Sequence, residues 1–227
     1  MLADTQGKNL NRYVPDYVLF DLETTGISCN CDDVIEISAV KVRGGQIVDS
    51  FSSLVNPGRP IPYGASQVNN ITDDMVADAP TMEETLPEFL AFFGDDVLVG
   101  HNIERFDLKF LIRDCRTRFG KVPGNDYVDT LRFARCRLAG LPSYRLTALA
   151  EHYSLSTSGA HRALNDCKMN HQVFERLARE PEQAPERICP RCGAPLAKRR
   201  GRFGAFYGCT GYPACRYTED ITGAHKI

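Results

Sequence analysis

The sequence has no run of about twenty consecutive apolar residues, the length that a membrane-spanning helix needs. It contains no tryptophan, and residues 1–17 lack the basic segment and apolar stretch of a secretory signal. No internal repeat and no low-complexity tract is present. These absences argue against a helical membrane protein, a secreted protein and a repeat protein. They favour a cytoplasmic protein with no membrane partner.

Charge is distributed unevenly along the 227 residues, of which 43% are hydrophobic and 25% charged. This composition is typical of a globular protein, and the length suits one ordinary domain plus a small module. Residues 1–186 carry 19 basic and 27 acidic side chains, whereas residues 187–217 carry seven basic and no acidic ones. An acidic body can concentrate metal ions, and a basic appendage can bind a phosphate backbone.

The pattern of strands and helices predicts an α/β protein. Residues 34–43 and 47–55 read as strands joined by a hairpin turn at Gly44-Gly45. Further strands are expected at 17–22, 97–100 and 127–129, and helices at 81–93, 107–119, 147–153 and 163–179. This order predicts a mixed sheet flanked by helices. The charged, proline-containing segment 181–186 is predicted to link a domain at 1–180 to a module at 187–227.

Two acids end the first predicted strand. Asp21 and Glu23 are two residues apart, so both side chains project from one face of the strand. Carboxylates this close repel each other unless a cation lies between them. Mg²⁺ and Mn²⁺ prefer such ligands, and a site for two ions needs more carboxylates from elsewhere in the chain. Taken alone, the pair is more simply explained as two ordinary acids at a strand end.

Further candidates lie at the starts of two helices. Asp107 begins one predicted helix, and Asp166 lies in the first turn of another. Either acid could simply be favoured there by the helix dipole. Asp166, however, leads an apolar helix face, where a charge needs a partner. His161 precedes this helix in a loop and suits a general base, although a solvated loop histidine is the simpler alternative.

The three segments that carry these residues together resemble the motifs of DEDDh 3′–5′ exonucleases. This family includes the proofreading subunit of bacterial DNA polymerase III and ribonuclease T. Residues 20–26 and 161–166 are similar to the first and third motifs. Residues 101–107 resemble the second, with one residue more than the usual His-Asn-x-x-Phe-Asp, as in TREX-type enzymes. The resemblance extends over residues 17–177.

The resemblance implies a ribonuclease H-like fold and hydrolysis of phosphodiesters to nucleoside 5′-monophosphates with two Mg²⁺ or Mn²⁺ ions. It implies that Asp21, Glu23 and Asp166 bind the first ion. Asp21 and Asp107 would bind the second, and His161 would deprotonate the attacking water. The terminal nucleotide would be seated by Thr24, Thr25, Gly26 and Asn102.

Four of the nine cysteines form two pairs near the end of the chain: Cys189, Cys192, Cys209 and Cys215. Two pairs of thiolates suit one tetrahedral, structural Zn²⁺. A segment of about forty residues needs such a metal because it cannot build a sufficient core. Disulfide pairing is the alternative, and a cytosolic setting disfavours it.

Basic and aromatic residues alternate between these cysteine pairs, a composition that suits single-stranded nucleic acid. A solvated basic face over a small aromatic core is the alternative. The segment resembles the four-cysteine zinc ribbon of bacterial type IA topoisomerases, which implies binding of single-stranded DNA. The predicted contact residues are Arg199, Arg200, Arg202, Phe203, Phe206 and Tyr207.

The sequence therefore predicts a metal-dependent 3′–5′ exonuclease acting on DNA, with single-stranded 3′ ends favoured. The zinc ribbon would act as a tether that raises the local substrate concentration. An RNA 3′-trimming enzyme of the same chemistry is one alternative, since no residue is seen to read a 2′-hydroxyl. A non-catalytic nucleic-acid adaptor is another, although such a protein would be expected to lose its metal ligands. An exonuclease of this kind could serve in proofreading, DNA repair, recombination or trimming of foreign DNA. The sequence does not indicate protein partners or oligomeric state.

Overall fold

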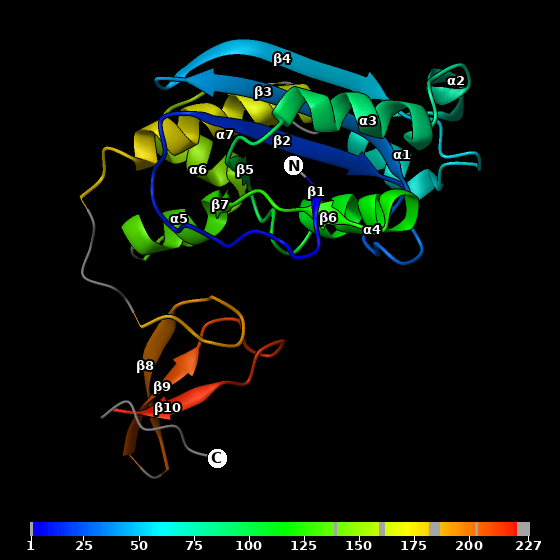
Figure 1. The fold of residues 1–227 in the computed structure, drawn as a ribbon. Helices are drawn as coiled ribbons and strands as arrows, with labels where there is room; N and C mark the ends of the chain where they lie inside the picture. Colours follow the sequence, from blue (N-terminus) through cyan, green and yellow to red (C-terminus); the bar gives the residue numbers. More distant parts are fainter. Residues whose placement is uncertain (1, 139, 159–161, 182–186, 203, 222–227) are drawn as a thin grey trace.

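The computed structural model describes residues 2–138, 140–158, 162–181, 187–202 and 204–221 (Figure 1). A five-stranded sheet has the order β4-β3-β2-β5-β7, and a three-stranded sheet near the end of the chain has the order β10-β9-β8. The strands of the larger sheet are β2 (Tyr17–Thr24), β3 (Val34–Arg43), β4 (Gln46–Leu54), β5 (Leu98–Gly100) and β7 (Tyr127–Asp129). A short antiparallel pair is formed by β1 (Leu2–Ala3) and β6 (Val122–Pro123).

The larger sheet is mixed, as predicted. β2 pairs antiparallel with β3, and β3 with β4, whereas β2 pairs parallel with β5, and β5 with β7. The β3–β4 turn contains Gly44 and Gly45, with φ of 56° and 74°. Positive φ at both central residues is what a two-residue hairpin turn with the native strand twist requires. The predicted hairpin is therefore confirmed.

Helices cover both faces of this sheet (Figure 1). Along β2, Leu19 packs in a core cluster with residues of α5, α6 and α7, whereas Phe20 packs in another cluster with residues of α3 and α4. Adjacent strand residues point to opposite faces, so one strand contributes to both cores. The helices are α1 (Tyr63–Asn69), α2 (Asp73–Val76), α3 (Met82–Phe93), α4 (Asp107–Phe119), α5 (Thr130–Arg137), α6 (Leu146–His152) and α7 (Ala163–Leu177). No helix among the described residues is both long and apolar enough to cross a bilayer.

Local signals set several helix ends. The capping box predicted at the start of α3 is present: the Thr81 backbone N–H donates to the Glu84 carboxylate at 2.8 Å. α4 ends at Gly120, whose φ is 65° and whose N–H donates to the Arg116 carbonyl at 3.0 Å. The sequence did not predict α5. Its N-cap is Asp129, whose carboxylate accepts the Leu131 backbone N–H at 3.0 Å.

The smaller sheet comprises β8 (Leu196–Gly201), β9 (Gly204–Cys209) and β10 (Thr218–Asp220). Its core is small, with Leu196, Tyr217 and the cysteines in one cluster. Such a core buries too little apolar surface to stabilise the module without a bound metal or a cross-link. Of the predicted linker 181–186, residues 182–186 lie outside the described part of the chain.

Candidate active site

Three carboxylates from distant parts of the sequence meet at one end of β2. Oxygen atoms of Asp21, Glu23 and Asp166 all lie within 4.8 Å of one another. Asp21 and Glu23 project from the same side of β2, as their spacing predicted. Asp166 comes from the first turn of α7, a helix that packs against β2. The strand and the helix therefore bring together the first and third predicted motifs.

A fourth carboxylate, Asp107, lies beside this group as the first residue of α4. Only 2% of its surface is exposed, and its Oδ1 atom accepts the backbone N–H of Leu22 at 3.1 Å. The longer second motif does not displace it. The turn at residues 101–106 accommodates the additional residue, with φ of 63° at Asn102. Asp107 is thereby held against the strand that carries Asp21 and Glu23.

Mutual repulsion and burial perturb these acids. Burial, followed by the neighbouring carboxylates with Asp107 foremost, raises the pKa of Asp21 well above its usual range. Burial and the charge of Asp166 raise the pKa of Glu23 to about 8. Burial raises the pKa of Asp107 to about 7, opposed by its hydrogen bonds to backbone N–H groups. Ionising all of them at neutral pH requires a compensating positive charge.

A bound metal ion would supply this positive charge, and the carboxylates offer suitable ligands for one. All the clustered ligand atoms are carboxylate oxygens, which Mg²⁺ and Mn²⁺ prefer over softer ligands. A cation among Asp21, Glu23 and Asp166 would relieve their repulsion and lower their pKa values. The residues present therefore fit the divalent ions that this type of site implies.

A salt bridge fixes the start of α7. Glu36 on β3 is 2% exposed, and it accepts hydrogen bonds from Arg162 Nε at 3.3 Å and Nη2 at 3.2 Å. It also accepts the backbone N–H of Ala163 at 3.3 Å. Because Asp166 lies one turn further along α7, these contacts position it relative to the sheet. Sequence reasoning missed the pair, although an acid inside the apolar run Val34–Ile37 is a signal that a partner exists.

The turn after β2 contains the predicted contacts Thr24, Thr25 and Gly26. The Thr24 hydroxyl donates to the Gly26 carbonyl at 2.6 Å, and the Thr25 hydroxyl accepts the Asp33 backbone N–H at 2.9 Å. A Cβ atom at Gly26 would lie 2.4 Å from the Asp32 carboxylate, so a side chain there would displace Asp32. Both hydroxyls therefore already form hydrogen bonds within the protein, and the Thr25 hydroxyl also accepts one from Arg59 at 3.2 Å.

A cavity of about 550 Å³ adjoins the acids, lined among others by Asp166, His101 and Asn102. His101 Nδ1 lies 3.1 Å from the Thr130 hydroxyl, and burial lowers the pKa of His101 to about 4. This imidazole is therefore neutral at physiological pH. The backbone N–H of Asn102 donates to the Asp129 carboxylate at 3.1 Å, which ties the second motif to α5. His161, the predicted general base, lies outside the described residues.

The four predicted cysteine ligands gather beside the smaller sheet. One sulfur atom from each lies within 4.8 Å of the others, with Cys189–Cys215 at 3.6 Å and Cys192–Cys209 at 3.1 Å. All are free thiols, so the disulfide alternative is wrong for this structure. Four sulfur donors at this spacing fit one tetrahedral Zn²⁺.

The predicted nucleic-acid contacts of this module divide between two faces. Arg199, Arg200 and Arg202 are exposed. Phe206 lines a cavity together with Arg199, its partner across β8 and β9. Tyr207 lies on the opposite face of β9, packs with the cysteine cluster and contacts the Arg187 guanidinium, 4.6 Å from its ring centroid. The structure therefore places Phe206, and not Tyr207, on the Arg199 side; Phe203 lies outside the described residues.

Two family models match separate parts of the chain. Residues 18–174 match the family described as RNase_T: Exonuclease. The chain belongs to this exonuclease family. Residues 186–223 match the family described as Topoisomerase DNA binding C4 zinc finger. The chain thus combines a 3′–5′ exonuclease domain with a topoisomerase-type zinc ribbon, as the resemblance implied.

Its curated relatives include DNA polymerase III proteins. The DNA polymerase III subunit epsilon of Aquifex aeolicus is 40% identical over 164 residues, which cover 72% of this chain and 81% of that protein. The DNA polymerase III PolC-type of Thermotoga maritima is 42% identical over 165 residues, but these cover only 12% of its length. The exonuclease domain is therefore homologous to the epsilon subunit, and the chain corresponds to a small part of the PolC-type proteins.

Solved structures show the same fold. Exonuclease X in complex with 5′ overhanging duplex DNA superposes with a TM-score of 0.61 at 28% identity, covering 75% of this chain and 95% of that one. E. coli Exonuclease I in complex with a dA16 oligonucleotide gives a TM-score of 0.62 at 17% identity, covering 90% and 53%. The predicted ribonuclease H-like arrangement is confirmed.

Proposed function

We propose that this exonuclease removes nucleoside 5′-monophosphates one at a time from single-stranded 3′ ends of DNA. The observation that carries the proposal is the convergence of Asp21, Glu23, Asp107 and Asp166 at one end of the sheet. A non-catalytic adaptor would have no need to maintain four mutually repelling carboxylates. DNA, and not RNA, is favoured by the epsilon-type relatives and by the zinc-ribbon match.

In the proposed site, Asp21, Glu23 and Asp166 would hold one divalent cation, and Asp21 and Asp107 a second. When bound, the two ions would stabilise the negative charge that develops on the phosphodiester during hydrolysis. The chain itself supplies the alignment of these ligands. β2 fixes two carboxylates, the Leu22 N–H orients Asp107, and the Arg162–Glu36 pair anchors the helix that carries Asp166.

The remaining roles concern the substrate and a proton. The cavity beside Asp166 would receive the terminal nucleotide, with Asn102 in its wall. His161 would accept the proton of the attacking water, a role that follows from the third motif. The neighbouring His101 is unsuited to this work because its pKa of about 4 leaves it too weak a base near pH 7. The ribbon would hold one structural Zn²⁺ and bind the strand upstream of the 3′ end.

The test is digestion of matched oligonucleotides labelled at either end, in single-stranded DNA, duplex DNA and single-stranded RNA, with Mg²⁺ or Mn²⁺. We expect the 3′ label to be released at once as a mononucleotide. The 5′ label should pass through a ladder of decreasing lengths. Internal fragments, or immediate release of the 5′ label, would contradict exonuclease action from the 3′ end. Faster digestion of RNA than of DNA would contradict the proposed substrate.

A further inference from the structure

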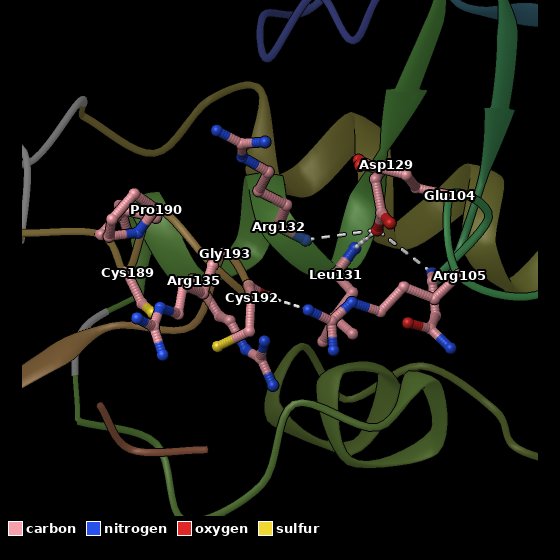
Figure 2. A pocket seen from close by; sticks show the side chains of 13 residues that line it. Glu104, Arg105, Asp129, Leu131, Arg132, Arg135, Cys189, Pro190, Cys192 and Gly193 are labelled. Carbon is pink, nitrogen blue, oxygen red and sulfur yellow. Dashed lines mark hydrogen bonds between the residues drawn. The ribbon is translucent and has the colours of Figure 1, made fainter. Parts of the chain in front are cut away.

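A continuous series of cavities joins the acidic site to the zinc ribbon. The cavity beside Asp166 shares Asn102, Leu131 and Arg135 with a cavity of about 370 Å³ between the exonuclease domain and the ribbon (Figure 2). A third cavity of about 420 Å³ also includes Arg135 and extends onto the ribbon as far as Arg216. Arg216 in turn lines a fourth cavity, of about 320 Å³, on the ribbon itself.

Arginines dominate the walls of this path. Seven of them line it: Arg105, Arg132, Arg135, Arg145, Arg191, Arg199 and Arg216. Among the described residues, none of the seven forms an ion pair with a carboxylate. The Nε atom of Arg132 is buried and has no hydrogen-bond partner among the described residues. Unpaired positive charge concentrated in a concave surface attracts an anion.

Few negative groups oppose these arginines. Between Asp166 and the ribbon, the acids on the cavity walls are Glu104 and Asp129. The Asp129 carboxylate already accepts backbone N–H groups of Asn102, Leu131 and Arg132, at 3.1, 3.0 and 3.3 Å. It caps α5 and is therefore engaged with the backbone. Arginines therefore outnumber acids on the walls of the path.

Both parts of the chain build the middle of the path. Arg132 and Arg135 come from α5, whereas Arg191 comes from the loop between Cys189 and Cys192. Arg105, in the turn before α4, donates a hydrogen bond to the Cys192 carbonyl across the boundary, as Figure 2 shows. The ribbon thus contacts the exonuclease domain directly, at the edge of the cavity that leads to the acids.

The far end of the path is aromatic. Phe206 and Tyr212 line the cavity on the ribbon together with Arg199 and Arg216, and 62% of the Tyr212 surface is exposed. Aromatic rings stack with unpaired bases, and neighbouring cations bind the backbone. This combination suits a single strand better than a duplex, whose bases are already stacked and paired. Positive charge repeated over successive cavities suits a polyanion better than a single phosphate.

We propose that this groove binds the phosphate backbone of a single-stranded substrate between the ribbon and the acidic site. The ribbon is then a docked extension of the active site and not merely a tether. That the strand is DNA bound by its 3′ end rests on the proposed function. This 3′ end lies beside Asp166, and the upstream nucleotides pass Arg135 and Arg191 and reach Tyr212.

The test measures binding without cleavage, using fluorescein-labelled oligothymidylates with phosphorothioate linkages and the full chain without added Mg²⁺ or Mn²⁺. Affinity is measured by anisotropy over a range of salt concentrations and oligonucleotide lengths. For single strands, removal of one cation that binds a phosphate lowers the slope of log K against log salt by about 0.7. The double variant Arg135→Gln/Arg191→Gln should therefore lower the slope by about 1.4. Lengthening the oligonucleotide upstream should also increase the affinity of this variant less than it increases the affinity of the wild type.

The matched control is Arg116→Gln/Arg176→Gln, which removes two arginines that line none of these cavities. Its slope should equal that of the wild type, and zinc content and thermal melting should show that both double variants are folded. A wild-type slope in the Arg135/Arg191 variant would overturn the groove, even if the enzyme digests DNA from the 3′ end. Arginine-dependent binding by a wild-type chain that releases no mononucleotide would support the groove and refute the proposed function.

Discussion

Glu23 and Glu36 lie directly opposite each other on β2 and β3. Like charges in this arrangement destabilise a strand pair unless a cation balances them. Arg162 balances Glu36 through two hydrogen bonds, whereas Glu23 joins Asp21 and Asp166 at the proposed metal site. Of these two opposed acids, Glu36 is neutralised by the Arg162 guanidinium and has a structural role, whereas Glu23 is a proposed metal ligand.

Arg162→Gln should lower the free energy of unfolding by about 2 kcal/mol, because it leaves the buried Glu36 carboxylate without its charged partner. The cost stays below that of a fully buried pair since the Arg162 side chain is 41% exposed. The free energy of unfolding is measured by urea denaturation. The double variant Glu36→Gln/Arg162→Gln should recover most of the loss, and Arg176→Gln should change stability by less than about 0.5 kcal/mol. Equal losses in the single and double variants would contradict a specific pair.

The metal-free protein should become less stable as pH rises, because the pKa of Glu23 is raised to about 8 and that of Asp107 to about 7. A carboxyl group whose pKa is raised in the folded state stabilises the protein fully below its pKa in the unfolded state, near 4. This contribution is lost as pH rises through the pKa in the folded state. A divalent cation binds the ionised carboxylates, so its stabilising effect should increase over the same range. The measurement is the melting temperature with and without millimolar Mg²⁺ at several pH values between 5 and 8, the range set by these pKa values.

The difference between the two melting curves cancels the titration of groups remote from the ions. In Glu23→Gln, the pH-dependent part of this difference should shrink. A Mg²⁺ shift that is the same at every pH would count against ion binding by these acids.

His161→Ala should slow single-turnover release of mononucleotides by about 10²–10⁴-fold, the usual contribution of a general base. Binding of Mg²⁺, followed by its thermal shift, should persist because the carboxylates are unchanged. His152→Ala, which removes an exposed imidazole on α6, is the control and should retain wild-type rates. An active His161→Ala enzyme would assign the proton transfer to another group or to solvent.

Cys192→Ser should abolish binding of zinc and unfold the ribbon, since the small core there depends on the metal. The exonuclease domain has its own core and should keep its thermal transition. Metal analysis should find one zinc per wild-type chain and one in the control Cys31→Ser, which alters an exposed cysteine outside the cluster. Full zinc occupancy in Cys192→Ser would show that the four-thiolate assignment is wrong.

Features governed by short-range physics could be predicted from the sequence. The turn at Gly44-Gly45, the capping box at Thr81 and the end of α4 at Gly120 each depend on a few adjacent residues. The convergence of Asp21 and Asp166 was predicted for a different reason, namely the resemblance of three ordered motifs to those of a known family.

A feature that needs a partner distant in sequence was missed, and so were two local signals. The sequence marks Glu36 as an acid in an apolar strand but does not point to Arg162 as its partner. Asp129 was interpreted as the end of a strand, although an acid followed by Thr-Leu-Arg-Phe is also an N-cap signal for α5. Tyr207 was grouped with Phe206 by composition, whereas the alternation of β9 separates them. The groove at Arg135 arises only where the ribbon meets α5.

The most direct test of the central claim is release of 5′-mononucleotides from 3′-labelled single-stranded DNA by Asp21→Asn and Asp166→Asn variants in Mg²⁺. We predict a loss of more than about a thousandfold in rate, since each change removes a ligand charge from the proposed ion site. Asp74→Asn, an exposed acid on α2, serves as the control and should match the wild type. Binding of the same strand should be largely retained by all three. Wild-type rates in either Asp21→Asn or Asp166→Asn would contradict the account.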